Sequence, residues 1–337
     1  MNATIHDVAR MANVSITTVS RVLNNNYPVK DETRERVEKV IKEIGYRPNE
    51  IARSLILKTT ANIGVVVPGI TNLFFPTIVE EINKTIAQEG YIISLFTTDG
   101  YSSVEKQVID NIISRNMDGI IIIDPTVENL ENGYLEQVGK ITPTIVINGN
   151  TDKYSYNFVS YEETVGTEEA FEYLYGLGHR SFAFVRGDKS LSYDLKETVF
   201  RDFLKLRGLG RGIVLSVDNA NSMHVLEETE KLFIKLFRSE FAATAIFACN
   251  DLMAVGILNA CNKSNIRVPE DISIIGFDNT ILSSISHPQI TTIDLDIYEV
   301  ARTAALKIMA LIKNKALSTD KVVFRTRVVY RESCGSV

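Results

Sequence analysis

The sequence has little cysteine and no long apolar run. Its three cysteines, Cys249, Cys261 and Cys334, are an odd number with no CxxC spacing, so we expect neither a disulfide framework nor a zinc site. The apolar runs at 63–67 and 120–123 are far shorter than the ~18 residues that span a bilayer, and residues 1–10 contain no apolar signal-peptide segment. These absences predict a protein of the reducing cytoplasm without a membrane segment.

The motifs of nucleotide-binding and hydrolytic enzymes are also missing. No GxGxxG follows an expected strand, and neither GxxxxGK[ST] nor GxSxG occurs. The four histidines (His6, His179, His224 and His287) are scattered, and none lies at metal-ligand spacing from a cysteine or a carboxylate. We therefore expect no catalytic residue, no metal and no cofactor.

Charge is distributed unevenly along the chain of 337 residues, which is long enough for two or three domains. The net charge is −6, yet residues 1–60 contain ten Lys and Arg against seven Asp and Glu. A basic N-terminal part on an acidic remainder predicts that only the N-terminal part meets a polyanion, because like charges hold the remainder away from it.

The first 45 residues predict three short helices. Thr4 and Asp7 have the spacing of a capping box, Ser15 can cap a second helix, and Gly45 can end a third. In the second helix one face is apolar, and the opposite face holds Ile16, Thr17, Ser20 and Arg21. Such a helix fits the major groove of DNA, so the segment is expected to be a helix-turn-helix unit. A purely structural three-helix bundle remains the alternative.

Residues 49–57 predict one more short helix, in which Leu55 is flanked by Arg53 and Lys58. A helix of this length does not persist alone in water, and an apolar side chain between bases suits a wedge in the minor groove. The alternative is a plain interdomain linker.

From residue 61 onward, apolar strand-like runs alternate with amphipathic helical stretches. This alternation predicts parallel sheets in two similar α/β halves, between which the chain crosses three times. The expected strands are 62–67, 91–96, 119–123, 144–147, 181–185, 212–215, 245–248 and 272–276, with returning segments near Tyr161, 290–293 and 321–323.

Ligands of open parallel sheets bind beyond the carboxyl ends of the strands, so a crevice between two halves is the expected pocket. Side chains that follow the expected strands are Phe74, Phe75, Thr98, Asp99, Asp124, Asn148, Arg186, Asn250, Asp251 and Asp278. Aromatic rings and hydrogen-bonding groups suit a polyhydroxylated ring. Each residue has a structural alternative: Asp251 as a helix cap, Phe75 as core, Asp124 as part of a turn.

Motifs spread over almost the whole chain resemble the lactose/galactose repressor (LacI/GalR) family of transcriptional regulators. They include Thr4-Ile5-His6-Asp7-Val8-Ala9, Thr18-Val19-Ser20-Arg21-Val22-Leu23-Asn24, Gly45-Tyr46-Arg47-Pro48-Asn49, Asn72-Leu73-Phe74-Phe75, Gly178-His179-Arg180, Asn250-Asp251-Leu252-Met253-Ala254-Val255-Gly256 and Gly276-Phe277-Asp278. The resemblance implies a small all-α head and an α/β body of two doubly wound, parallel-sheet subdomains of the periplasmic-binding-protein type.

The implied organisation is a DNA-binding domain at 1–48 with its helix-turn-helix motif at 5–24, a hinge helix and linker at 49–60, and an effector-binding and dimerisation domain at 61–337. The expected subdomains are about 61–160 with 291–321, and 161–290 with 322–337. Ile16, Thr17 and Arg21 would meet bases, and Leu55 would enter the minor groove. The expected DNA-binding residues are Thr4, Ser15, Ile16, Thr17, Ser20, Arg21, Asn24, Ala52 and Leu55.

The family also implies that Asn250 and Asp278 hold effector hydroxyls. Lys196 stands where the family has an arginine that grips many effectors, so the bidentate fork is lost. Ser160-Tyr161 replaces the usual Asp-Asn pair. Arg186 together with Lys196 indicates an anionic group such as phosphate. The expected effector-binding residues are Phe74, Phe75, Asp99, Asn148, Tyr161, Arg186, Lys196, Asn250 and Asp278.

These observations predict a cytoplasmic, sequence-specific DNA-binding regulator. It is expected to be a repressor and a homodimer on a near-palindromic operator, with a small molecule (a sugar, a sugar phosphate or similar) that changes operator affinity. A helical tetramerisation segment is not expected, because no leucine heptads follow Tyr330. The alternatives are a solute-binding protein, a sugar-processing enzyme, and a regulator controlled by a protein co-regulator.

Overall fold

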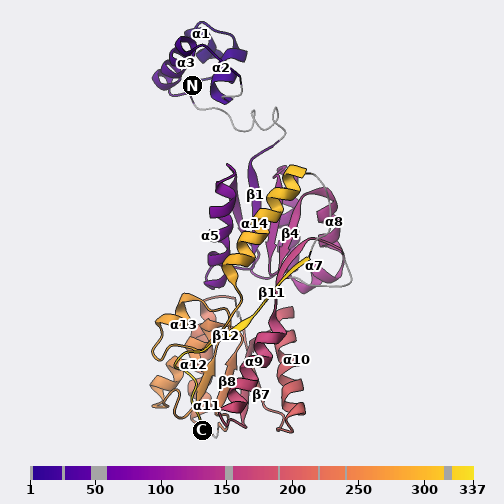
Figure 1. Cartoon of the computed structure of the whole chain (residues 1–337), viewed down its shortest axis with the longest axis vertical. Helices are drawn as coiled ribbons and strands as arrows, with labels where there is room; N and C mark the ends of the chain where they lie inside the picture. The colour runs from indigo at the N-terminus through magenta and orange to yellow at the C-terminus, as the bar shows by residue number, and fades with distance from the viewer. Residues whose placement is uncertain are drawn as a thin grey trace. The chain divides into compact units, whose positions relative to one another are not determined.

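A computed structural model describes residues 3–24, 27–46, 59–148, 155–188, 190–218, 221–239, 241–314 and 321–337. The chain divides into two compact units, Met1–Thr60 and Ala61–Val337 (Figure 1). The hinge segment expected at 49–60, with Ala52 and Leu55, lies outside the described residues except for Thr59 and Thr60.

The first unit contains α1 (Ile5–Met11), α2 (Ile16–Asn24) and α3 (Asp31–Ile44). The Thr4–Asp7 capping box that the sequence predicts is present at the start of α1. Gly45 ends α3 in the left-handed conformation with φ +62°, which a residue with a Cβ rarely adopts. The three helices close around a small core that includes Val8, Val19 and Val37.

The second unit holds two parallel sheets. The larger sheet has the order β11-β5-β4-β3-β1-β2, and the smaller has the order β7-β6-β8-β9. Strands β1 and β3 are almost continuous runs of Val and Ile because both of their faces are covered. The strands of the larger sheet are β1 (Asn62–Val67), β2 (Ile92–Thr97), β3 (Gly119–Ile123), β4 (Thr144–Ile147), β5 (Phe158–Glu162) and β11 (Lys321–Arg325). Those of the smaller sheet are β6 (Phe182–Gly187), β7 (Ile213–Val217), β8 (Ala245–Ala248) and β9 (Ser273–Ile275).

Helices cover both sheets, and each sheet with its helices is called a subdomain below. The first subdomain contains α5 (Phe74–Ala87), α6 (Ser102–Ser114), α7 (Val127–Glu131), α8 (Tyr134–Ile141) and α14 (Ile297–Asn314). The second contains α9 (Glu163–Gly176), α10 (Leu191–Leu206), α11 (His224–Phe237), α12 (Asp251–Lys263) and α13 (Ile281–Ile285). The pairs α5 with α14, α9 with α10, and α11 with α12 pack against each other (Figure 1). This is the two-subdomain α/β body that the sequence predicts.

The chain crosses between the subdomains three times: after β5, between β10 (Thr292–Asp294) and α14, and between β11 and β12 (Arg327–Val329). Strands β10 and β12 form a separate antiparallel pair. The expected boundary, which assigned 161–162 and 322–325 to the second subdomain, needs correction. Those residues pair with each other at the edge of the larger sheet, with Val322 opposite Val159 and Arg325 opposite Glu162. Residues 161–162 and 322–325 therefore belong to the larger sheet. The chain leaves this sheet for the second subdomain only after the carboxyl ends of β5 and β11.

Candidate functional site

The exposed face of α2 is the candidate nucleic-acid interface. Ser15, Ile16, Thr17 and Arg21 are exposed, while Val19 and Val22 on the opposite face are buried in the core of the unit. The Ser15 hydroxyl accepts a hydrogen bond from the Thr18 amide at 3.1 Å, which fixes the start of the helix. The N-terminal end of α2 is therefore held rigidly with short polar side chains pointing outward.

The remaining expected residues of this face are tied into the unit itself. Asn24 donates from its amide to the Ser20 carbonyl oxygen at 2.9 Å, so both residues are half-buried at the end of α2. Thr4 serves as the cap of α1, and its hydroxyl donates to the Asp7 carboxylate at 2.8 Å. The Arg21 guanidinium lies 5.1 Å from the ring centroid of Tyr27, a cation–π distance that leaves its N–H groups free to fork onto another partner.

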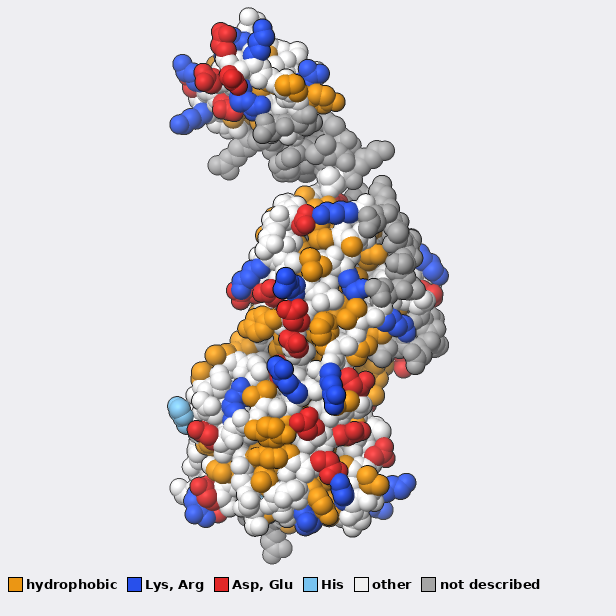
Figure 2. Space-filling view, viewed as in Figure 1, with side chains coloured by type: hydrophobic (Ala, Val, Ile, Leu, Met, Phe, Trp, Pro, Cys, Tyr) orange, Lys and Arg blue, Asp and Glu red, His pale blue; other side chains and the backbone are white. Residues whose placement is uncertain are grey.

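Basic and acidic side chains are intermixed on the face of this unit that Figure 2 shows. Residues 3–46 contain seven Lys and Arg and six Asp and Glu, so most of the positive excess of residues 1–60 belongs to positions 47–60. Attraction to phosphate thus depends largely on the segment that follows the helices, whereas α2 offers shape and hydrogen bonding.

The second candidate site is a pocket between the two subdomains of the body. From the first subdomain it is lined by Asn72, Phe74, Phe75, Asp124, Asn148 and Tyr161. From the second it is lined by Ser190, Ser192, Tyr193, Lys196, Asn221, Cys249, Asn250 and Asp278. Seven of the nine expected effector-binding residues are therefore brought together: Phe74, Phe75, Asn148, Tyr161, Lys196, Asn250 and Asp278.

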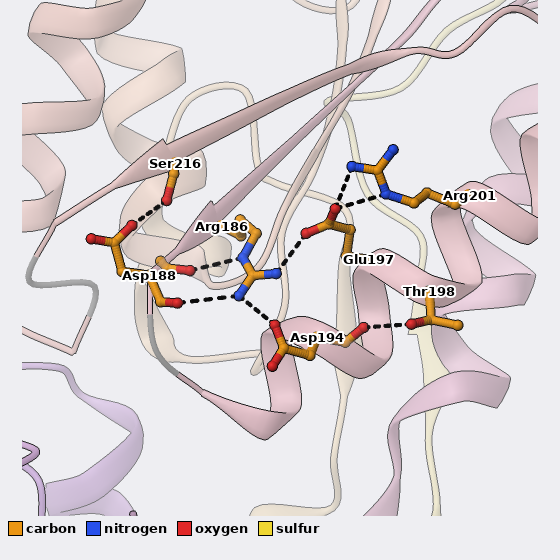
Figure 3. A network of polar contacts seen from close by, with 8 residues as sticks. Arg186, Asp188, Asp194, Glu197, Thr198, Arg201 and Ser216 are labelled. Carbon is orange, nitrogen blue, oxygen red and sulfur yellow. Dashed lines mark hydrogen bonds and ion pairs between the residues drawn. The ribbon is translucent and has the colours of Figure 1, made fainter. Parts of the chain in front are cut away.

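Asp99 and Arg186, the other two expected effector-binding residues, do not line this pocket. Asp99 follows β2, the edge strand of its sheet, and its side chain is exposed. Arg186 lies near the carboxyl end of β6, but its guanidinium forms ion pairs with Asp194 at 2.6 Å and also with Glu197 (Figure 3). Its remaining donors reach the carbonyl oxygens of Gly187 and Asp188. An arginine engaged in this way is not available to an anionic ligand.

Lys196 is buried in the pocket wall beside Glu163, the first residue of α9. Its Nζ lies 3.6 Å from Glu163 Oε2, and the two side chains are 2% and 3% exposed. Ser192 donates to the same carboxylate at 2.7 Å, and the ammonium group lies 3.5 Å from the centroid of the Phe277 ring. The charge of Lys196 is thus already balanced by a protein carboxylate.

The polar residues at the strand ends have distinct roles. Asn250 caps α12 by accepting from the Met253 amide at 2.9 Å, and Asn148 donates to Asp124 at 3.2 Å. Asp251 has a structural role, but not as the helix cap that the alternative reading predicted, since its carboxylate accepts from the hydroxyls of Thr280 and Thr292. Burial raises the pKa of Asp251 to about 6.

Burial also shifts the titratable groups that line the pocket. It raises the pKa of Asp124 to about 7, and the nearby Glu163 charge acts in the same direction. It raises the pKa of Asp278 well above its ordinary value, and that of Cys249 to about 12. Since the Cys249 thiol stays protonated, it is a poor nucleophile.

Several pocket residues were not among the expected site residues. Ser190, Ser192 and Tyr193 come shortly after β6, and the Tyr193 hydroxyl lies 3.3 Å from Asn221 Oδ1. The strand-end rule would have found the two serines had it been extended past Arg186. Glu163 carried no such signal, because its partner Lys196 is distant in sequence.

The pocket offers amides, hydroxyls, carboxyls and aromatic rings, which bind a ligand by hydrogen bonds and stacking. Among the residues that the structure describes, no group of three His, Cys, Asp or Glu side chains is placed to hold a metal ion. Nor does any helix of the described ranges have the length and apolar character needed to cross a bilayer.

Comparison with known proteins matches both parts of the chain to described families. Residues 4–49 match the model of bacterial regulatory proteins of the lacI family, and residues 171–334 match a periplasmic binding protein-like domain. The chain is 30% identical to catabolite control protein A of Priestia megaterium, over 99% of each chain. It is 31% identical to the protein of that name from Staphylococcus xylosus, over 98% of this chain and 99% of the relative.

Among solved structures, the lac repressor dimer bound to operator and the anti-inducer ONPF is similar over 100% of both chains. Its TM-score is 0.87 and its sequence identity is 25%. The likeness therefore covers the three-helix unit and the two-subdomain body alike.

Proposed function

The chain belongs to the lacI family of bacterial regulatory proteins and is a DNA-binding transcriptional regulator, and from that premise we propose that it is a repressor whose operator affinity is changed by a small molecule. The observation that carries this proposal is the conjunction of two sites in one chain. One is a rigid helix with an exposed polar N-terminal face, and the other is a polar pocket between two subdomains. A ligand that favours one arrangement of the subdomains changes operator affinity through its differential binding to the two states.

In this proposal Ile16, Thr17 and Arg21 read base edges in the major groove. The exposure of Ile16 and Thr17 at the start of α2 and of Arg21 in its last turn supports the assignment, and the guanidinium fork of Arg21 suits guanine. Thr4, Ser15, Ser20 and Asn24 are assigned to phosphates and to the support of α2. Ala52 and Leu55 are assigned to the minor groove, on the hinge at 49–60 that connects the DNA-binding domain at 1–48 with the body.

We further propose that the protein acts as a homodimer on a near-palindromic operator, as the similar lac repressor structure is a dimer bound to operator. Apolar side chains on and beside the edge strand β2 support a covered face: Ile92 is 62% exposed and Leu95 41%. Leu95→Asp should convert the dimer into a monomer and weaken operator binding, as measured by light scattering and fluorescence anisotropy. A dimer unchanged by this substitution would place the interface elsewhere.

We assign the protein to the cytoplasm, where its DNA target is, and we assign it no catalysis. The similarity of the chain to bacterial regulatory proteins of the lacI family and to catabolite control protein A supports binding without turnover. A solute-binding protein would share the body but would show no DNA binding. A regulator controlled by a protein co-regulator would bind DNA without responding to any small molecule.

The test of DNA reading compares two arginines. Arg21→Ala should cost roughly 1–3 kcal/mol on an operator selected in vitro and far less on random DNA, because it removes a base contact. Arg36→Ala makes the same chemical change on an exposed position of α3 and should leave the preference between the two DNAs intact. Equal losses on both DNAs for Arg21→Ala would reduce Arg21 to a phosphate contact.

A further inference from the structure

The pocket and its wall contain more carboxyl groups than cationic groups. Its one cationic lining residue, Lys196, is buried 3.6 Å from Glu163, so that pair is neutral before any ligand enters. The guanidinium of Arg186, the other basic residue expected here, forms ion pairs with Asp194 and Glu197 outside the pocket. Two further carboxyls of the lining, Asp124 and Asp278, form no ion pair within the described part of the chain, and Lys196 acts on both only at longer range.

Asp278 is the more exceptional of these two residues. Asp278 is only 8% exposed, and within the described ranges no protein group donates a hydrogen bond to its carboxyl group. Its backbone is fixed by the amide, which donates to the Ile293 carbonyl oxygen at 3.0 Å. A buried carboxyl that lines a pocket and has no protein donor is a vacant acceptor for a ligand.

Asp124 faces the same pocket from the other subdomain. It accepts from Asn148 at 3.2 Å and is hydrogen-bonded to Asn221, so amide dipoles rather than a full positive charge stabilise it. The carboxyls of Asp124 and Asp278 also repel each other. Because the pKa of both carboxyls is raised, they hold a proton more readily than an ordinary aspartate, and a positively charged ligand would favour their ionised forms and release those protons.

The ligand classes differ in how they meet this charge. An anionic ligand would add a like charge to a site whose lysine is already paired, and the hydroxyls of a neutral polyol would donate hydrogen bonds to the two carboxyls without supplying a positive charge. A ligand with one ammonium group would balance one of them and donate up to three hydrogen bonds. The pocket amides of Asn148 and Asn250 and the ring of Tyr161 suit hydroxyls and a sugar face.

We propose that the ligand of this pocket is a polyhydroxylated molecule carrying one positive charge, of the amino sugar class, whose ammonium group binds between Asp278 and Asp124. This inference rests on the proposed effector function and replaces the anionic group that Arg186 and Lys196 indicated in the sequence.

The test uses matched sugars on the full-length protein. Glucose, galactose and mannose are each compared with their 2-amino and 6-phosphate derivatives by isothermal titration calorimetry and thermal shift. At least one amino sugar should bind tenfold or more tightly than its neutral parent, and the phosphates should not bind. Its binding should release protons, seen as a dependence of the heat on buffer ionisation enthalpy. Neutral or phosphorylated sugars that bind as tightly, or amino sugars that all fail to bind, would overturn the inference.

Variants locate the ammonium group. Asp278→Asn and Asp124→Asn keep the side-chain size and remove the charge, so each should abolish the preference for the amino sugar. Asp99→Asn, at an exposed position outside the pocket, should retain it. Operator affinity of each variant without ligand serves as the check that it is folded. If the preference survives in both pocket variants, the assignment is wrong.

Failure of this inference is distinguishable from failure of the proposed function. Neutral sugars that bind and change operator affinity would refute the charged ligand and leave the effector role standing. Amino sugars that bind in the predicted way but leave operator affinity unchanged would refute the effector role alone.

Discussion

Replacing Glu163 by Gln should destabilise the body strongly, because it removes the carboxylate that forms an ion pair with the buried Lys196 ammonium. The two side chains are 3% and 2% exposed and 3.6 Å apart, and Gln keeps the shape of the residue and an oxygen for the Ser192 hydroxyl. Removing one partner of a buried ion pair costs about 3–5 kcal/mol. For a body of residues 61–337, at ~2–4 °C per kcal/mol, the melting temperature should fall by roughly 10 °C.

The assay is thermal unfolding of the full-length protein followed by circular dichroism, with two controls. Glu80→Gln makes the same change in the exposed pair of Glu80 with Lys84 and should leave the melting temperature nearly unchanged. The double variant Glu163→Gln/Lys196→Met removes both charges and should recover most of the loss. A Glu163→Gln protein as stable as Glu80→Gln would refute the reasoning, since the pair would then be solvated.

Two further predictions concern the hinge and the pH dependence of stability. Leu55→Ala should lower operator affinity at least tenfold, about 1.4 kcal/mol, and leave the melting temperature unchanged. Both quantities are measured on one preparation. A lower melting temperature with unchanged operator affinity would instead make Leu55 an ordinary core residue. Asp124 has a folded-state pKa of about 7, above that of an unfolded aspartate, so its protonated form favours the folded state below pH ~4, and this contribution is lost as the pH rises to about 7. Asp124→Asn should therefore weaken the fall in stability between those pH values in urea titrations, and an identical pH profile for both proteins would contradict the raised pKa.

The local elements could be predicted from the sequence because their signals are short-range. The Thr4 capping box, the Ser15 cap and the Gly45 terminus each involve residues at most four positions apart, and all three are present. An uninterrupted apolar run such as 119–123 predicts a strand covered on both faces, and β3 is such a strand.

The pocket could be predicted only in part, because the strand-end rule places a backbone and not a side chain. Asn250 and Asp278 line the pocket as expected. Arg186 occupies a comparable position, but α10 places the Asp194 and Glu197 carboxylates within its reach, and the guanidinium turns to them. The pairing of Lys196 with Glu163 arises from the packing of α10 against α9, which no local pattern encodes.

The threefold crossing between subdomains also dictates the order in which a ribosome can complete the fold. Helices α1 to α3 are contiguous, so that unit can form as soon as residue 46 has left the exit tunnel. The first subdomain begins at residue 61, yet it lacks α14 until residue 314 and its edge strand β11 until residue 325. In the folded body α5, whose buried residues include Ile78 and Ile82, packs against α14. During most of translation α14 has not yet been synthesised, so α5 lacks this partner. The three-helix unit can therefore be complete in the nascent chain long before the body is. A chain truncated before α14 would keep the three-helix unit and would lack a complete body.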